Sequence, residues 1–449
     1  MSKDLTQGRP FRVLLQFSLP VIAGNLFQLF YTLADTVIVG RTLGAQALAA
    51  VGSTTIVIYF VLCFVQGFTG GFGICLAQRF GARDVPGQRS SAAVSWLLSA
   101  GFAVIITVLF CALAHPILRW MRTPEDIYAE AYSYMFIVLL GTGATVFYNM
   151  ISNMLRSLGD SRTPLFFLIF SALLNVVLDL VFILPLGMGV AGAAWATVLS
   201  QLLSAVLCTV VGMRSFDVLR TRRADFAGWR RAAAKHLAVG FPMGFQMSVM
   251  CIGQLAMQTG VNSLGSVAVA GYTAATKVDQ LSVLMNNAFG IALSSFVAQN
   301  YGAGQYRRIS EGVRACLVQI EVCNVFMCAL LIGCRHLVVP LFLDSPTAEV
   351  IRYSDGYLFA VCPFYVVLGL LMVFRTAIQS MGNSRTPFEA CVIELVMRIL
   401  GSVGLAALLA PYGLSYTGIC LSHTLAWLGA TALLMPVYFR QMKTLPLSQ

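Results

Sequence analysis

The sequence predicts an all-α polytopic membrane protein, with twelve transmembrane helices in two six-helix lobes related by a parallel internal repeat. Composition is the first observation behind this prediction. Of the 449 residues 58% are hydrophobic and 10% are charged, and the mean hydropathy is +0.81. Soluble domains carry about 25% charged residues. The second observation is a series of apolar runs long enough to cross a bilayer, and the third is the recurrence of motifs between the two halves of the chain.

The apolar runs predict twelve spans, since about 20 helical residues cross a hydrocarbon core of roughly 30 Å. Most of the 29 lysines and arginines fall at the two termini and in the even-numbered connections. The positive-inside rule therefore places both termini in the cytoplasm. The same distribution argues against nucleic acid as the reason for the net charge of +11. We expect no cleavable signal peptide. The predicted spans are 13–39, 49–76, 91–114, 130–155, 164–186, 191–213, 234–260, 273–298, 313–334, 355–379, 388–410 and 417–440.

Two loop motifs occur twice, at an offset of about 222 residues. The segment AQRFGARD at 77–84 returns as AQNYGAGQ at 298–305, and LRSLGDSRTP at 155–164 returns as IQSMGNSRTP at 378–387. Six spans per repeat is an even number, so both halves have the same orientation in the membrane. We therefore expect an N-terminal lobe at 1–213, a basic cytoplasmic linker at 214–235 and a C-terminal lobe at 236–449. Parallel repeats of this kind are typical of secondary transporters.

Four oxygen-bearing side chains of the N-terminal lobe are predicted to lie at one depth. Asn175 and Asp179 are four residues apart in span 5, so they share one helix face. Counting about 1.5 Å per residue puts Asp35 of span 1 about 6 Å from the outer end, Asp179 roughly 10 Å and Thr197 of span 6 about 9 Å. Acids within a membrane are costly and usually functional.

Carboxylate, amide and hydroxyl oxygens suit Na⁺ or a shared proton. We therefore predict a loading site for a coupling cation at Asp35, Asn175, Asp179 and Thr197. In the alternative interpretation, each acid separately satisfies a backbone group or a water. No metal site beyond Na⁺ is expected, because the twelve cysteines form no CxxC and show no Cys/His metal spacing.

The C-terminal lobe has a different set of residues at the equivalent positions. Asn175 aligns with Arg398, Asp179 with Ser402, Thr197 with His423, and Asp35 falls near Met257. A cation would be repelled by the arginine, so the two lobes are predicted to differ in role. Glu394 and Arg398 are spaced i, i+4 and are expected to pair as a structural ion pair or cavity wall rather than as a second ion site.

A candidate substrate cavity involves span 7 and the start of span 8. Methionines recur along span 7 at helical spacing, and promiscuous binding surfaces favour this adaptable side chain. Packing between helices is the alternative interpretation of the same stripe. The candidate lining residues are Met250, Gln254, Met257, Gln258 and Asp279.

The twelve spans, the duplicated loops and the Asp35/Asn175/Asp179/Thr197 set resemble the multidrug and toxic compound extrusion (MATE) family of antiporters. The resemblance covers nearly the whole chain. It implies that these four residues bind Na⁺ or H⁺ and that the protein exports amphipathic, often cationic, compounds by alternating access. It also implies a bend of span 1 at Pro20. Some members carry further acids in spans 7 and 10, where this chain has Gln254 and Gln258 and no clear acid, so a second cation site of that type is not expected.

The predicted function is therefore a cation-coupled antiporter of the plasma or inner membrane, acting on small molecules as a monomer and without a cofactor. A flippase for a lipid-linked saccharide is the alternative, and Arg398 offers it only thin support. An intramembrane enzyme is disfavoured because the chain has no HExxH and no GxSxG in a credible setting. A channel is disfavoured because no filter segment is apparent.

Overall fold

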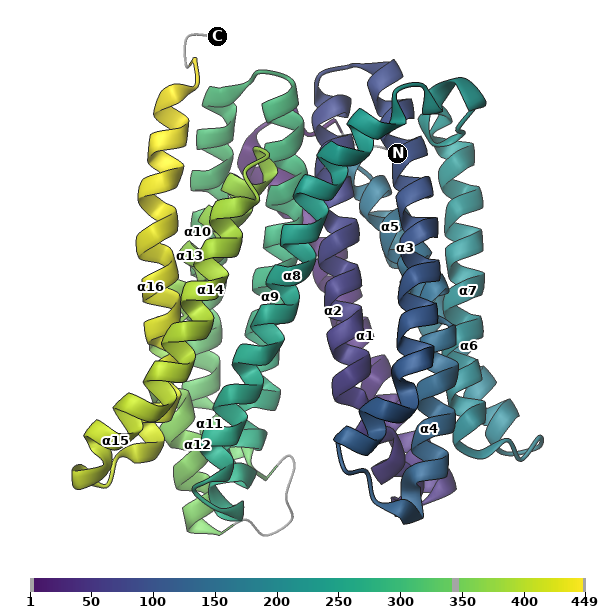
Figure 1. Ribbon diagram of the computed structural model, residues 1–449. Helices are drawn as coiled ribbons and strands as arrows, with labels where there is room; N and C mark the ends of the chain where they lie inside the picture. The colour runs from purple at the N-terminus through teal and green to yellow at the C-terminus, as the bar shows by residue number, and fades with distance from the viewer. Residues whose placement is uncertain (1–3, 341–346, 447–449) are drawn as a thin grey trace. The chain divides into compact units, whose positions relative to one another are not determined.

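The computed structural model describes residues 4–340 and 347–446, and all regular structure within them is helical (Figure 1). The helices of the first half are α1 (Pro10–Leu43), α2 (Ala45–Gly81), α3 (Val85–Trp120), α4 (Glu125–Leu140), α5 (Thr142–Ser157), α6 (Arg162–Ile183) and α7 (Gly189–Ser215). Two short 3₁₀ segments, η1 (Asp217–Leu219) and η2 (Arg223–Phe226), lead into the second half.

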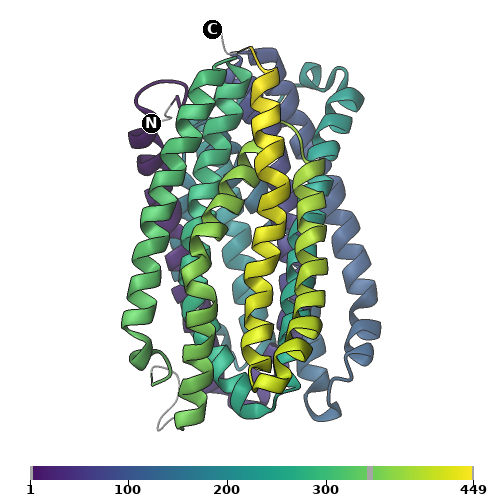
Figure 2. The ribbon, with the colours of Figure 1, turned by 90° about the vertical axis from the view of Figure 1, so that its left-hand side faces the viewer.

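The second half has the same order of long helices. They are α8 (Trp229–Asn262), α9 (Ser266–Gly302), α10 (Tyr306–Gly333), α11 (Arg335–Val338), α12 (Ala348–Val361), α13 (Tyr365–Ser380), α14 (Arg385–Leu400), α15 (Ala406–Leu409) and α16 (Ser415–Thr444). The short segments η3 (Cys362–Phe364), η4 (Gly401–Leu405) and η5 (Ala410–Tyr412) interrupt them. Helix α16 packs against α13 and α14, as Figure 2 shows.

The predicted all-helical, polytopic architecture is confirmed. Among the described residues, eleven helical stretches are long and apolar enough to cross a membrane, or twelve if the bent pair α4 and α5 is one span. That pair turns by 42° at Gly141. A Cβ on Gly141 would lie 2.2 Å from a methyl group of Val198, so the break occurs where α7 passes too close for any other residue.

The chain divides into two structural units that exchange one helix segment each. One unit holds Ala23–Gly244, and the other holds Leu5–Ile22 together with residues 245–446. Residues 5–22, predicted for the N-terminal lobe, therefore belong to the second unit, and residues 236–244, predicted for the C-terminal lobe, belong to the first. The exchange points are equivalent in the repeat, since α1 changes unit two residues after Pro20 and α8 changes unit two residues after Pro242. Proline removes one backbone hydrogen bond from a helix and so favours a change of direction there.

In the first unit, α2 and the start of α8 are in backbone contact at two glycines. A Cβ on Gly67 would lie 2.3 Å from the carbonyl oxygen of Met243, and a Cβ on Gly71 would lie 2.6 Å from the Cα of Gly240. Small residues allow this approach between membrane helices. The outward faces carry large exposed hydrophobic side chains, such as Val104 and Phe166, both 64% exposed, as expected for surfaces solvated by lipid.

We expect Gly71→Ala to destabilise the protein by about 1–3 kcal/mol, because the added methyl group meets backbone rather than a movable side chain. Gly52→Ala is the matched control on the same helix, since a Cβ there meets nothing within 4 Å. The control should leave stability unchanged or raise it slightly. Thermal unfolding of the purified variants in detergent measures both effects. Equal unfolding temperatures for the two variants would contradict the close packing.

Candidate functional site: a buried acidic cluster in the first unit

The two residues predicted to share a face of span 5 lie on the single buried stripe of α6. That stripe recurs about every fourth residue and includes Ser171, Asn175, Asp179 and Ile183. Asp179 is 0% exposed and Asn175 is 1% exposed, whereas Leu173 on the opposite face is 64% exposed. Helix α6 packs along α7, which carries Thr197. The local pattern of the sequence thus turns the only acid of α6 toward protein and away from lipid.

Asn175 connects Asp179 to Thr197. One orientation of its amide satisfies both polar atoms: Nδ2 donates to Asp179 Oδ2 at 2.9 Å, and Oδ1 accepts from the Thr197 backbone N–H at 3.0 Å. In the opposite orientation Nδ2 instead donates to the Thr197 hydroxyl at 3.2 Å. The Thr197 hydroxyl also donates to the carbonyl of Ala193, one turn earlier, at 3.1 Å. The amide therefore holds the Asp179 carboxyl group in a defined position.

Asp35 of α1 completes the cluster. Its carboxyl group is half-buried and lies within hydrogen-bond range of the Asp179 carboxyl group. Oδ1 of Asp35 and Oδ1 of Asp179 are both buried, and among the described residues neither has a hydrogen-bond partner. Two carboxylates in contact repel each other unless a proton or a cation lies between them. The structure thus brings all four predicted residues together and leaves two acceptor atoms unsatisfied.

Two tyrosines of the cluster were not among the residues predicted from the sequence. Tyr31 precedes Asp35 by one helical turn on α1, hydrogen-bonds to Thr197 and lies close to both acids. Tyr134 of α4 is 9% exposed and lies close to the same two acids. The i, i+4 spacing from Asp35 is a signal that could have identified Tyr31. Nothing in the local sequence around Tyr134 points to the cluster.

The equivalent positions of the second unit are also buried, but they hold an arginine and no acid. Arg398 is 4% exposed, Ser402 7% and His423 9%. The predicted ion pair of α14 is present, with Arg398 Nη2 lying 3.4 Å from Glu394 Oε2. A second arginine, Arg375 of α13, pairs with the other oxygen of the same carboxylate. One buried carboxylate thus serves two buried guanidinium groups, and sequence analysis missed Arg375.

The candidate substrate-cavity residues on α8 point in different directions. Met257 is 0% exposed and packs within the hydrophobic core of the second unit, which favours the packing interpretation, and its place in a substrate cavity stays a prediction. Gln254 is exposed, and Gln258 donates to Asn262 at 2.9 Å on its own helix. Met250 is half-buried, and its sulfur lies 3.7 Å from an Arg375 nitrogen.

Asp279, the remaining candidate, lies in a separate cluster of α9. Its carboxyl group accepts hydrogen bonds from the hydroxyl groups of Tyr357, at 3.0 Å, and of Tyr365. Both carboxylate oxygens are therefore occupied, unlike those of Asp35 and Asp179. The contacts of the five candidates thus differ from one to the next, and a substrate cavity that they share stays a prediction.

Comparison with known proteins decides the family. The MatE family pattern matches residues 20–181 and matches again at residues 242–403. The chain belongs to the MATE family. The two matches coincide with the predicted repeat. Proteins of this family are multidrug efflux transporters and not enzymes, and the chain is a multi-pass membrane protein.

Individual MATE proteins are similar over most of the chain. A probable multidrug resistance protein of Bacillus subtilis (strain 168), YpnP, is 31% identical over 84% of each chain. The FAD transporter of Shewanella oneidensis is 27% identical over 88% of this chain and 87% of its own. A crystal structure of MATE in complex with MaL6 superposes with a TM-score of 0.91 over 99% of both chains at 24% identity, which establishes the fold.

Proposed function

We propose that this MATE protein is a proton-coupled antiporter that exports amphipathic small molecules and loads its proton at the Asp35–Asp179 pair. Contact between the two carboxyl groups is the observation that carries the proposal. A driving ion must bind one transport state better than the other. The pair meets that requirement if its separation changes between states, because two adjacent carboxylates retain a proton that separated ones release.

The choice of H⁺ over Na⁺ rests on the occupation of the neutral ligands. In the orientation that satisfies both amide atoms, Asn175 gives its oxygen to the Thr197 backbone N–H and its nitrogen to Asp179. The Thr197 hydroxyl is engaged with Ala193. Among the side-chain oxygens of the cluster, Oδ1 of Asp35 and Oδ1 of Asp179 are the buried atoms for which the described residues supply no hydrogen-bond partner. Hard metal cations need several oxygen ligands at once, whereas a shared proton needs two.

The proposal is tested by efflux of a fluorescent cation from proteoliposomes under separately imposed pH and Na⁺ gradients. We expect the pH gradient alone to drive efflux and the Na⁺ gradient alone to have no effect. Efflux driven by Na⁺ at equal pH on both sides would overturn proton coupling. Efflux of neither a fluorescent cation nor FAD under either gradient would overturn the antiporter proposal as a whole.

The variant Thr197→Val provides a second test that distinguishes proton coupling from Na⁺ coupling. The change removes the hydroxyl and keeps the shape of the side chain, so it removes one candidate Na⁺ ligand without touching either acid. We expect proton-driven efflux to fall by no more than about fivefold, corresponding to one lost hydrogen bond of about 1 kcal/mol. Initial efflux rates measure the effect. The control is Thr55→Val of α2, because Thr55 is exposed and its hydroxyl likewise donates to the carbonyl one turn earlier. Complete loss of efflux would favour a metal cation.

Two classes of exported compound, cationic and anionic, are candidates. Export of cationic compounds is the first, as the family resemblance implies. An anionic aromatic compound is the second, favoured by the excess positive charge of the Arg375–Glu394–Arg398 cluster and by the 27% identity to the FAD transporter. Parallel efflux assays with ethidium and with FAD distinguish the two. The predicted flippase activity has no support in the names of the two relatives compared above.

Charge distribution supports a cytoplasmic location for both termini, as predicted from the basic connections. The two repeats in one chain support a monomeric transporter, because the symmetric pair of units is already present. Membrane-impermeant thiol labelling of cysteines introduced near each terminus tests the orientation. Labelling of both positions in intact cells would contradict it.

A further inference from the structure

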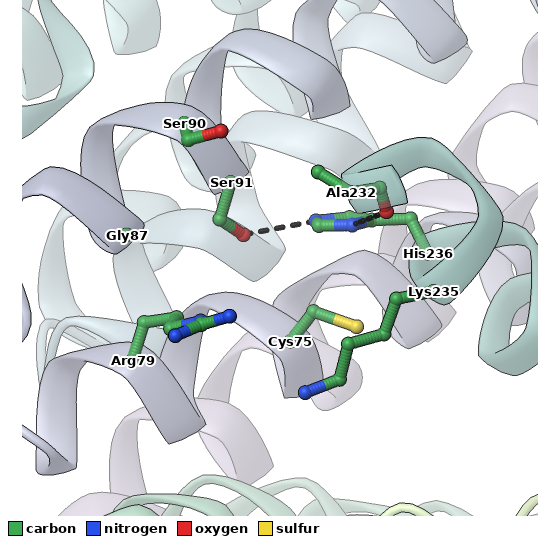
Figure 3. Close-up of a pocket in the computed structure, with 8 residues that line it drawn as sticks. All are labelled: Cys75, Arg79, Gly87, Ser90, Ser91, Ala232, Lys235 and His236. Carbon is green, nitrogen blue, oxygen red and sulfur yellow. Dashed lines mark hydrogen bonds between the residues drawn. The ribbon is translucent and has the colours of Figure 1, made fainter. Parts of the chain in front are cut away.

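A small basic cavity opens in the first unit where α2, α3 and α8 meet, remote in the sequence from the acidic cluster. Its volume is about 120 Å³. Figure 3 shows the residues that line it, and Arg79 and Lys235 extend toward each other from opposite walls. The lining residues are Cys75, Arg79, Gly87, Ser90, Ser91, Ala232, Lys235 and His236.

The charges around this cavity favour an anion. Arg79 gives one nitrogen to Asp84, at 2.7 Å, and Asp84 also caps α3 by accepting from the N–H of Gly87 at 2.9 Å. Lys235 takes part in no ion pair among the described residues. No acidic side chain is among the eight lining residues. Two cations and one acid therefore leave a net positive charge at the cavity.

One wall of the cavity holds a fixed hydrogen-bonded pair. His236 is 3% exposed, and its Nδ1 lies 2.8 Å from the carbonyl oxygen of Ala232. A carbonyl can only accept, so Nδ1 carries a hydrogen, and Nε2 forms a second hydrogen bond with the Ser91 hydroxyl at 2.9 Å. Ser90 is next to this pair on α3 and can donate to a ligand above it.

The same three helices also line an apolar groove. Its residues lie deeper along α2 and α3 than those of the cavity, and on α8 they lie on both sides of the cavity residues in the sequence. Its volume is about 400 Å³, and on α3 it begins at Leu97, seven residues or about 10 Å along the helix from Ser90. Gly101 forms part of the groove, and a Cβ on it would meet nothing within 4 Å. The groove is lined by Phe68, Leu97, Leu98, Gly101, Phe102, Ile105, Trp229, Leu237 and Phe241.

We propose that the basic cavity and the apolar groove together bind one anionic phospholipid. Its phosphate lies between Arg79 and Lys235, and an acyl chain occupies the groove. Phosphate oxygens take charge-assisted hydrogen bonds from guanidinium and ammonium groups. Basic pockets between transmembrane helices are suited to anionic headgroups because the adjoining helix faces accept the chains. A free phosphate would use the cavity alone, whereas a lipid needs both features at the observed spacing.

Native mass spectrometry of the purified protein, titrated with one ligand at a time, tests the assignment. The ligands are phosphatidylglycerol, phosphatidylcholine and glycerol 3-phosphate, the last carrying the phosphate without chains. Both phosphatidyl lipids carry the phosphate, but the choline group adds a positive charge that Arg79 and Lys235 repel. We therefore expect phosphatidylglycerol to bind about tenfold more tightly than phosphatidylcholine. Glycerol 3-phosphate should bind at least tenfold more weakly than phosphatidylglycerol. Equal binding of the two phosphatidyl lipids would overturn the role of the cations.

Two substitutions test the two halves of the site. Lys235→Gln should weaken phosphatidylglycerol binding about tenfold. Arg231→Gln is its control, because Arg231 is exposed one turn earlier on α8 and outside the cavity. Gly101→Leu adds a side chain that starts in open space, because a Cβ there meets nothing within 4 Å, and that lies in the groove. It should weaken binding of the lipid and leave binding of glycerol 3-phosphate unchanged.

The outcomes decide between the lipid, a free phosphate and neither. If Gly101→Leu leaves phosphatidylglycerol binding unchanged, or if glycerol 3-phosphate binds as tightly as the lipid, the lipid assignment is overturned and a free phosphate takes its place. If Lys235→Gln and Arg231→Gln weaken the lipid equally, the site is overturned in favour of general surface charge. Thermal unfolding of each variant confirms that the binding data come from folded protein.

Discussion

Asp179→Asn should abolish gradient-driven export while leaving the protein folded. The amide has the shape of the carboxyl group and can keep the contact with Asn175, but it cannot take up and release a proton. Without a difference in proton binding between states, the gradient cannot bias the transport cycle. We expect the initial rate of pH-driven efflux from proteoliposomes to fall at least tenfold, and Asp35→Asn to have the same effect because the two carboxyl groups act as a pair.

Glu349→Gln is the matched control for both variants. It makes the same change from an acid to an amide at an exposed position of α12, in the second unit. Its efflux rate should equal that of the unchanged protein, and all three variants should elute as monodisperse protein with similar unfolding temperatures. Full pH-driven efflux by folded Asp179→Asn protein would show that the buried pair is structural, which is the alternative interpretation of these acids.

The sequence was sufficient to predict most of the first-unit cluster. Each of its four predicted members is polar in an otherwise apolar run, and polar residues in a membrane helix turn toward protein. Counting helical rises then placed Asp35, Asp179 and Thr197 at one depth. In the structure the two acids are in contact, and Asn175 links Asp179 to Thr197. Tyr134 could not be found in this way, because tyrosine is common in transmembrane helices and its proximity to the acids depends on the packing of α4.

Other features depend on tertiary packing that no local pattern records. Gly141 looks like any helical glycine in the sequence, and only the approach of Val198 shows why a residue without a Cβ stands between α4 and α5. Met257 belongs to a helical stripe that fits a binding surface and a core equally well, and the structure places it in the core. The assignment of α1 and α8 segments to different units could be anticipated from the sequence only through Pro20 and Pro242, which occupy equivalent positions of the repeat.

The largest effect on stability is expected for Glu394→Gln. Glu394 is 1% exposed and serves Arg375 and Arg398 at once, so its neutralisation leaves two buried guanidinium groups without a counter-charge. Removing one partner of a buried pair costs about 3–5 kcal/mol, because the remaining charge cannot be hydrated. Here two charges are left, and they also repel each other. We expect the variant to unfold well below the temperature of the unchanged protein, or to fail to accumulate in the membrane.

Glu389→Gln on the same helix isolates the contribution of burial. Glu389 pairs with Arg385 at 2.8 Å, but the side chains are 47% and 89% exposed. Exposed pairs of this kind contribute about 0–1 kcal/mol, so the control should unfold near the temperature of the unchanged protein. A second test uses Arg375→Met with Glu394→Gln, which leaves one buried guanidinium group instead of two and should recover part of the lost stability. Equal losses from Glu389→Gln and Glu394→Gln would show that the cluster is hydrated within the membrane, and so accessible to a charged substrate.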